Sequence, residues 1–198
     1  MASVESQDPA PTAKRTAIQA SVLAATEALL AEGASYADLN IEKIATRAGI
    51  SRTAFYFYFR DKRELLMRLT EEVNELLYQQ ADIWFSGDGE PEPEMREALT
   101  NIAAVYAQHG VLLRAIVEVS TYDEVVAGYW RELLGRFAEA SLRRIEQGGV
   151  AADPRATAFA LCWMTERALY QQLVQDEGPA LEDLVEALAG IWLRSVYA

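Results

Sequence analysis

Cysteine and histidine are almost absent from this 198-residue chain, which contains one of each. The single cysteine, Cys162, excludes a disulfide within the chain and suits a reducing cytoplasm. One cysteine and one histidine also cannot supply the ligands of a zinc site, so we expect no metal and no other cofactor. His109 lies at the predicted end of a helix, where a partial positive charge is favourable, and is assigned no chemistry.

Long apolar runs are missing as well. None approaches the ~18–20 residues that cross a bilayer, although 51% of the residues are hydrophobic and can form a packed core. The first 13 residues, MASVESQDPAPTA, are acidic and rich in proline, alanine and serine. They are interpreted as a disordered leader rather than a signal peptide. These features predict a soluble cytoplasmic protein with no membrane partner.

The chain contains none of the common enzyme signatures, such as G-x-S-x-G, the P-loop or H-E-x-x-H. Its 30 Asp and Glu residues produce chance carboxylate pairs on helix surfaces. We therefore expect no enzymatic activity and no catalytic residues. Turnover of a bound apolar compound would be needed to support the alternative, a helical enzyme.

The net charge of −12 is distributed unevenly along the chain. Residues 14–68 contain nine Lys and Arg against six Asp and Glu, a balance of +3. Residues 69–198 contain nine against 22, a balance of −13. Because phosphate attracts the first segment and repels the second, this distribution favours an oriented approach to DNA.

Apolar residues repeat with the helical period almost everywhere, and no convincing segment alternates with period two. The sequence therefore predicts an all-α fold of about nine helices. Glycine- and proline-containing breaks separate most of them, the clearest being SGDGEPEP at 86–93. The predicted helices cover residues 14–32, 41–48, 52–59, 61–85, 94–108, 111–119, 122–147, 154–176 and 180–197.

Residues 39–66 have the pattern of a helix-turn-helix, the motif that inserts a helix into the major groove of DNA. A short apolar-faced helix ends at Gly49, and Ser51 can cap the next helix. The helical period turns Phe55 and Phe59 toward the core. The side chains expected to point outward are Arg52, Thr53, Tyr56 and Phe57.

Arg, Thr, Tyr and Phe exposed together suit a DNA groove better than a solvated surface. Arg can bind guanine through two hydrogen bonds, Thr and Phe can contact a thymine methyl group, and Tyr can bind phosphate. Lys62 is placed to meet a phosphate at the start of the following helix. The alternative is a three-helix bundle with a tolerated aromatic surface. The predicted DNA-binding residues are Ser51, Arg52, Thr53, Tyr56, Phe57 and Lys62.

The segment AGISRTAFYFYFRDKRELL (48–66) closely resembles the signature of TetR-type repressors. FYFYF (55–59), MTERALY (164–170) and IWLRSVYA (191–198) are similar to the EthR-like branch of that family. The resemblance implies a homodimer with a narrow hydrophobic ligand tunnel in each subunit. It divides the chain into a leader (1–13), a helix-turn-helix domain (14–60), and a ligand-binding and dimerisation domain (61–198) in which helix 61–85 is the connector.

Taken alone, each apolar stripe on the later helices is more often packed core than ligand pocket, but the resemblance favours a tunnel at the matching positions. The expected lining residues are Met95, Leu99, Ile102, Trp130, Leu134, Phe137, Cys162, Thr165 and Trp192. Where this chain has Cys162 and Thr165, the branch carries amides, so its ligand preference does not transfer. Glu166 and Arg167 match a pair in the family and are interpreted as an internal ion pair.

No cluster of Lys or Arg faces inward along these stripes, so the ligand is expected to be neutral, elongated and mostly apolar, with Thr165 as its best polar partner. The last two helices are the predicted dimer seam, with core packing as the alternative for its residues. The candidates are Phe159, Trp163, Leu184 and Leu188.

These observations predict a transcription regulator that binds a near-palindromic operator as a dimer. In the favoured hypothesis it is a repressor that a small hydrophobic ligand releases from DNA. Two alternatives remain open at this point. One is a ligand-dependent activator, and the other is a small-molecule-binding protein without operator binding.

Overall fold

The structure is a computed structural model that describes residues 13–197, and all regular secondary structure within that range is helical. The all-α prediction is confirmed. The predicted leader lies outside the described residues except for Ala13, where the first helix begins. The helices are α1 (Ala13–Ala31), α2 (Ile41–Arg47), α3 (Arg52–Phe55), α4 (Lys62–Phe85), α5 (Pro91–Ser120), α6 (Glu124–Gly148), α7 (Pro154–Leu173) and α8 (Leu181–Tyr197).

The described residues form eight helices rather than about nine, because α5 continues through the break that was expected after residue 108. His109 has φ −113° and ψ 19°, which are not helical values, so α5 is kinked there. Histidine and glycine both keep the backbone N–H that proline lacks, so the chain can bend at this point without ending the helix.

The chain divides into two compact units, one ending at Leu65 and the other beginning at Leu66. The division falls inside α4, whose first turn belongs to the first unit and whose remainder belongs to the second. The first unit otherwise contains α1, α2 and α3, with α2 packed against both of the others.

Side-chain caps determine where the short helices of the first unit begin. Asn40 accepts a hydrogen bond from the Lys43 N–H at 2.8 Å, and Ser51 accepts one from the Ala54 N–H at 3.1 Å. Gly49 connects the two helices with a φ of +72°, a conformation that glycine adopts without strain. The regular part of α3 ends at Phe55, and the chain continues as a turn rather than as the helix expected to residue 59.

The start of α4 is capped almost as predicted. Asp61 accepts a hydrogen bond from the Glu64 N–H at 2.9 Å. Glu64 then reaches back to the N–H of Arg60 at 2.8 Å, one residue earlier than a capping box requires. The two carboxylates therefore accept hydrogen bonds from the backbone N–H groups of Arg60 and Glu64, which have no partner within the helix at its start.

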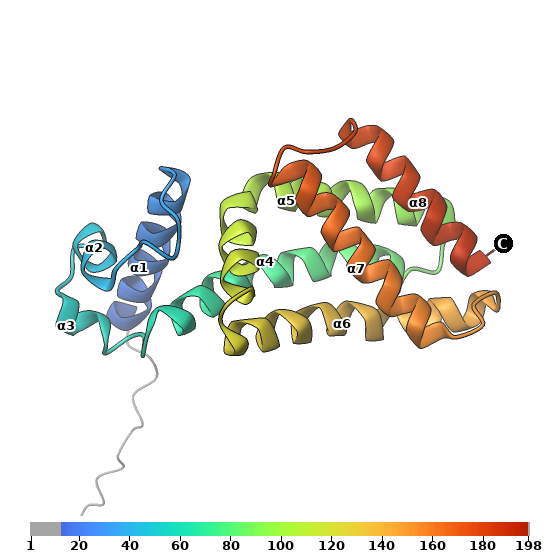
Figure 1. The fold of residues 1–198 in the computed structure, drawn as a ribbon. Helices are drawn as coiled ribbons and strands as arrows, with labels where there is room; N and C mark the ends of the chain where they lie inside the picture. Colours follow the sequence, from blue (N-terminus) through green and yellow to red (C-terminus); the bar gives the residue numbers. More distant parts are fainter. Residues whose placement is uncertain (1–12, 198) are drawn as a thin grey trace, which may run out of the picture. The chain divides into compact units, whose positions relative to one another are not determined.

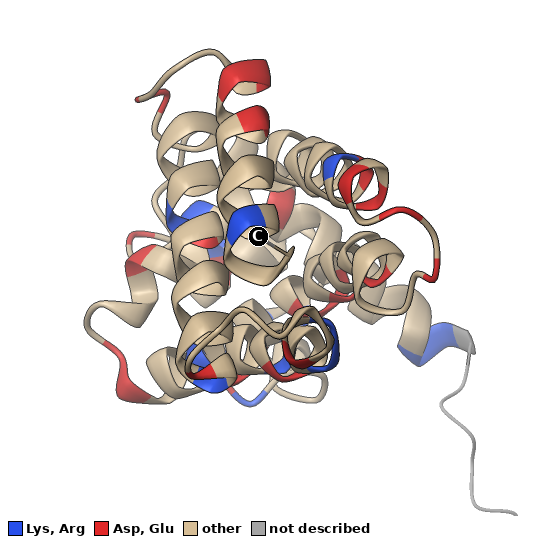
Figure 2. Ribbon diagram, turned by 90° about the vertical axis from the view of Figure 1, so that its right-hand side faces the viewer, with Lys and Arg blue, Asp and Glu red and all other residues tan. Residues whose placement is uncertain are grey.

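The second unit is a bundle in which α5 packs against α6, α7 and α8 (Figure 1). α4 joins this bundle through side chains of α6. The Tyr129 hydroxyl donates to the carbonyl of Met67 at 3.0 Å, and Arg136 pairs with Glu75 at 2.8 Å. Asp and Glu residues are spread over its helices and loops (Figure 2).

One helix, α5, is long and apolar enough to cross a membrane when judged by length and composition alone. α5 passes this test on its mean hydropathy, although polar residues such as Gln108 and Arg114 interrupt it and it contains no continuous apolar run of that length. In this fold the apolar surface of α5 packs against α6, α7 and α8. The core helix of a soluble protein passes the same test.

The C-terminal ends of α6 and α8 approach so closely that Gly148 has no room for a side chain. A methyl group there would overlap the carbonyl oxygen of Val196 and lie 2.8 Å from its carbonyl carbon. We expect Gly148→Ala to lower the free energy of unfolding by about 1–3 kcal/mol, because backbone must move to relieve the overlap. Urea denaturation measures this change.

Gly135, in the middle of the same helix, provides the matched control. It is exposed, and an added methyl would have no heavy atom within 4 Å. Gly135→Ala should therefore raise stability by about 0.5–1 kcal/mol through helix propensity. Equal stabilisation by both substitutions would show that α6 and α8 do not meet at Gly148.

Candidate nucleic-acid interface and ligand pocket

The helix-turn-helix places four predicted DNA-binding side chains on one exposed surface. Arg52, Thr53, Tyr56 and Phe57 line a shared hollow beside α3. The phenyl ring of Phe57 is 73% exposed, the largest exposure among the large hydrophobic side chains that the structure describes. An exposed aromatic ring of this size costs free energy in water, so its position indicates a contact surface.

The core side of α3 holds this surface in place. Phe55 and Phe59 are buried, as predicted, and their rings lie 5.5 Å apart. Phe55 also makes an edge-on contact with Tyr56 at 5.7 Å. The hydroxyl of Ser51 caps α3, so its observed role is to start the helix that carries the other four residues.

Arg52 differs from its basic neighbours in having no partner among the described residues. Arg47 pairs with Glu32 at 2.5 Å, and Arg60 pairs with Glu64 at 3.0 Å. The guanidinium of Arg52 makes no hydrogen bond or ion pair within residues 13–197. Arg52 is therefore the cation on this surface that is available to bind a base or a phosphate.

Lys62 is not oriented as the sequence suggested. Its ammonium donates to the carbonyl oxygens of Tyr36 and Ala37, at 2.7 and 3.2 Å, and lies over the Tyr36 ring. The Tyr36 hydroxyl in turn donates to the carbonyl of Lys62. Burial lowers the pKa of Lys62, opposed by the charge of Asp38. In this structure the hydrogen bonds of Lys62 connect the start of α4 to the loop after α1.

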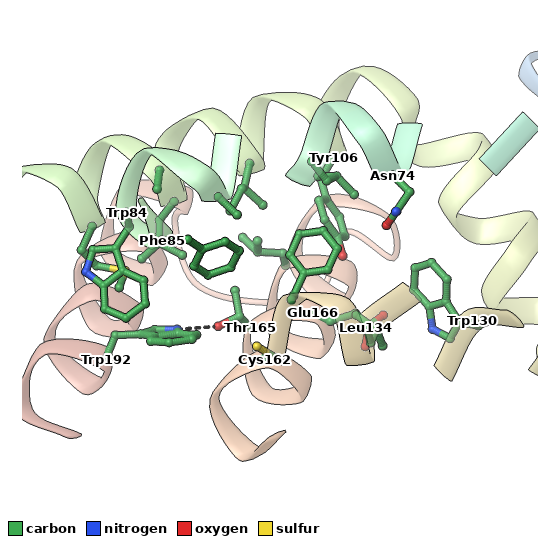
Figure 3. Close-up of a pocket in the computed structure, with 18 residues that line it drawn as sticks. Asn74, Trp84, Phe85, Tyr106, Trp130, Leu134, Cys162, Thr165, Glu166 and Trp192 are labelled. Atoms are coloured by element: carbon green, nitrogen blue, oxygen red, sulfur yellow. Dashed lines mark hydrogen bonds between the residues drawn. The ribbon is translucent and has the colours of Figure 1, made fainter. Parts of the chain in front are cut away.

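The nine residues expected to line a tunnel all surround one pocket of the second unit (Figure 3). They come from α5, α6, α7 and α8. The cavity that remains between the lining side chains has a volume of about 80 Å³. Because pockets for drug-sized ligands measure about 300–1,000 Å³, the lining side chains must move apart to admit such a ligand.

α4 contributes a wall of this pocket that was not expected from the sequence. An apolar stripe at helical spacing on α4, including Leu77, Ala81 and Trp84, was present in the sequence. It was overlooked because α4 was interpreted as a connector. The lining residues that were not predicted are Asn74, Leu77, Ala81, Trp84, Phe85, Ala98, Tyr106, Glu166 and Leu169.

One end of the pocket is aromatic, with the rings of Trp84 and Trp192 in edge contact at 5.2 Å. Thr165 lies beside them, and its hydroxyl is already engaged twice. It donates to the carbonyl of Leu161 at 2.8 Å and accepts from the Trp192 indole N–H at 2.9 Å. A threonine hydroxyl has one hydrogen to donate, so Thr165 has none left for a ligand carbonyl. In this conformation Thr165 can offer a ligand only an acceptor lone pair.

The other end contains buried polar groups without hydrogen-bond partners. They are the side-chain N–H₂ of Asn74, the indole N–H of Trp130 and both carboxyl oxygens of Glu166. The expected Glu166–Arg167 ion pair is present at 3.6 Å, but Arg167 is half-exposed and makes no hydrogen bond to the carboxyl. Burial raises the pKa of Glu166, and Arg167 opposes this shift.

The thiol of Cys162, on the pocket wall, is held in its protonated form. Burial raises its pKa to about 12, although a hydrogen bond with Ser141 lowers it slightly. Only the thiolate reacts with disulfide reagents. At pH 8 we expect native Cys162 to react at least tenfold more slowly than in urea-unfolded protein, and to accelerate as pH rises. Ellman's reagent measures both rates, and equal rates would contradict the burial of this thiol.

The four candidate dimer residues separate into two groups. Phe159 is 61% exposed, its ring contacts that of Trp163 at 6.0 Å, and Leu184 is half-buried. Leu188, in contrast, is only 2% exposed and packs inside the subunit, so it is not available on that surface. Neighbouring Ile191 is exposed on the same helix and was not predicted. No group of side chains in residues 13–197 has the composition of a metal site.

Two family descriptions match this chain. "Transcriptional regulator EthR, C-terminal domain" matches residues 95–198, and "Bacterial regulatory proteins, tetR family" matches residues 22–69. The HTH-type transcriptional regulator EthR of Mycolicibacterium smegmatis is 29% identical over 191 residues, covering 90% of this chain and 86% of that protein. EthR of Mycobacterium tuberculosis is 28% identical over 214 residues, covering 98% and 97%.

Solved structures show the same fold at lower identity. FadR from Bacillus subtilis, in complex with stearoyl-CoA, is 15% identical with a TM-score of 0.70, covering 90% of this chain and 99% of that one. SmeT, the repressor of the Stenotrophomonas maltophilia multidrug efflux pump SmeDEF, is 22% identical with a TM-score of 0.67, covering 89% of each chain.

Proposed function

The chain belongs to the TetR family of bacterial transcription regulators, with a C-terminal domain of the EthR type, and we propose that it represses transcription from a near-palindromic operator. In this proposal the protein acts in the cytoplasm as a homodimer. The first unit reads DNA, and the second unit binds a largely apolar ligand that releases the operator.

The surface around α3 is the observation that carries this proposal. Arg52, Thr53, Tyr56 and Phe57 are exposed together beside a capped helix, in the segment of the chain with a surplus of positive charge. A surplus of only +3 binds phosphate weakly. Two copies in a dimer double both the charge and the number of base contacts, and they suit two successive major grooves.

Binding of the full-length protein to a pool of random-sequence duplexes tests the proposal directly. We expect repeated selection to enrich a near-palindrome whose half-sites are about one helical turn apart. Affinity for it should fall steeply as salt rises, because bound phosphates release counterions. Failure to enrich any sequence, with weak binding at low salt alone, would support a small-molecule-binding protein without an operator.

The pocket supports the ligand-dependent half of the proposal. Its wall includes α4, the helix whose first turn belongs to the DNA-reading unit. A ligand that contacts α4 therefore acts on an element shared by both units. For release, the ligand must bind the DNA-free state better; a ~100-fold preference corresponds to about 2.7 kcal/mol of coupling. By the same linkage, operator DNA must weaken ligand binding by an equal factor.

The exposed face of α7 and α8 is our proposed dimer seam. Phe159→Glu would place a charge in the middle of an apolar contact, because Phe159 is exposed in the subunit and contacts Trp163. We expect sedimentation equilibrium at micromolar concentration to give a dimer for the parent protein and a monomer for this variant. Thr157→Glu, two residues before Phe159 on α7 and so about 200° around the helix from it, provides the control. A parent protein with the mass of a monomer would contradict the seam.

A further inference from the structure

The polar end of the pocket contains three side chains with four atoms that have no hydrogen-bond partner in the protein. Asn74, Trp130 and Glu166 are 3%, 5% and 3% exposed, respectively. Their free atoms are two N–H donors, from Asn74 and Trp130, and the two carboxyl oxygens of Glu166. A buried polar group without a partner is unfavourable, so a bound molecule that satisfies these atoms gains affinity.

These side chains come from three different helices, yet they lie at the same end of the pocket (Figure 3). Asn74 is on α4, Trp130 on α6 and Glu166 on α7. Trp84 also has an unpartnered indole N–H, but it lies at the opposite, aromatic end. Donors and acceptors are therefore brought together only at the polar end, within the part of the chain that the structure describes.

We propose that this end binds a neutral carboxamide-type head group, one that carries a carbonyl acceptor and an N–H donor on the same group, with its apolar tail directed along the pocket. The carbonyl accepts from Asn74 and Trp130, and the N–H donates to Glu166. This inference rests on the proposed ligand-binding role of the pocket and specifies the chemical class of ligand.

Other head groups match the free atoms less completely. A ketone or ester accepts from Asn74 and Trp130 but leaves Glu166 without a partner. A carboxylate places a negative charge beside Glu166, and an alkylammonium presents a cation to the two N–H donors. Burial raises the pKa of Glu166, and an amide N–H can donate to its carboxyl group in either protonation state.

Isothermal titration calorimetry on the full-length protein without DNA separates these classes with probes of one tail length. Undecanamide and 2-dodecanone differ only by an N–H₂ in place of a methyl group, and undecylamine provides the cation. We expect undecanamide to bind the parent protein about tenfold more tightly than 2-dodecanone, because only the amide satisfies Glu166.

Variants at Glu166 show which atom recognises the amide. Glu166→Leu should bind amide and ketone with equal affinity. Glu166→Gln should keep the preference, because its side-chain oxygen still accepts a hydrogen bond. Glu146→Leu, an exposed carboxylate removed from α6, is the matched control and should leave the tenfold ratio unchanged.

The outcomes separate this inference from the proposed function. Equal binding of amide and ketone by the parent protein would overturn the head-group assignment and leave the ligand pocket intact. Tightest binding of undecylamine, lost in Glu166→Gln, would overturn it in favour of a cationic ligand. Binding of none of the three probes would overturn the head-group assignment and count against the pocket as well.

Discussion

Simultaneous replacement of Arg52, Thr53, Tyr56 and Phe57 by alanine should lower operator affinity by more than a thousandfold without unfolding the protein. Each base contact contributes about 1–3 kcal/mol, and a dimer makes every contact twice. The fold should remain intact because all four side chains are exposed. The cap at Ser51 and the buried rings of α3 are unchanged by these substitutions.

Fluorescence anisotropy with the selected operator measures this loss, and a thermal melt shows whether the variant is folded. Lys43→Ala is the matched control, since it removes one positive charge from an exposed position on α2 of the same unit. Single substitutions should have different effects on DNA binding. Arg52→Ala is expected to relax sequence preference, whereas Tyr56→Phe should weaken binding to all sequences more evenly. An unchanged footprint for the quadruple variant would remove this surface from the proposal.

The second large effect is expected from filling the pocket. Leu99 is buried on α5 and lines the pocket, so Leu99→Trp places an indole in space that a ligand would occupy. If occupancy favours the released state, operator affinity should fall about 100-fold, equivalent to about 2.7 kcal/mol. The melting temperature should not fall, because the added ring fills existing space.

Leu113→Trp is the matched control for this experiment. Leu113 is equally buried on α5 but does not line the pocket. Its replacement should overpack the core and lower the melting temperature. If Leu99→Trp behaves in the same way, with a lower melting temperature and unaltered operator binding, the stripes around Leu99 are packed core and the pocket is not a ligand site.

Local structure was the part of this fold most accessible from sequence. Asn40 and Ser51 cap α2 and α3 at the predicted positions, because a cap depends on residues only a few positions apart. The outward direction of Arg52 and the inward direction of Phe55 follow from the helical period alone. The nine predicted pocket residues needed the family resemblance in addition, since a packed core has the same periodicity.

The structure differs from the sequence-based expectations where the position of a side chain depends on a distant segment. Lys62 donates to carbonyls of the loop after α1, and no local pattern predicts where that loop returns. Leu188 faces the core while Ile191 on the same helix is exposed, because the apolar positions of α8 cover more than one face. Periodicity likewise shows that α4 has an apolar stripe without showing that the stripe faces a cavity.

The distribution of tryptophan gives the protein a separate optical signal for each of two events. Trp84, Trp130 and Trp192 line the pocket, whereas the fourth tryptophan, Trp163, contacts exposed Phe159 on α7. Under the proposed function, entry of a ligand is expected to change the polarity around the first three indoles, and association of subunits through α7 is expected to change it around the fourth. The intrinsic emission of a Trp163→Phe variant therefore reports pocket occupancy without a contribution from the dimer seam, and no dye has to be attached.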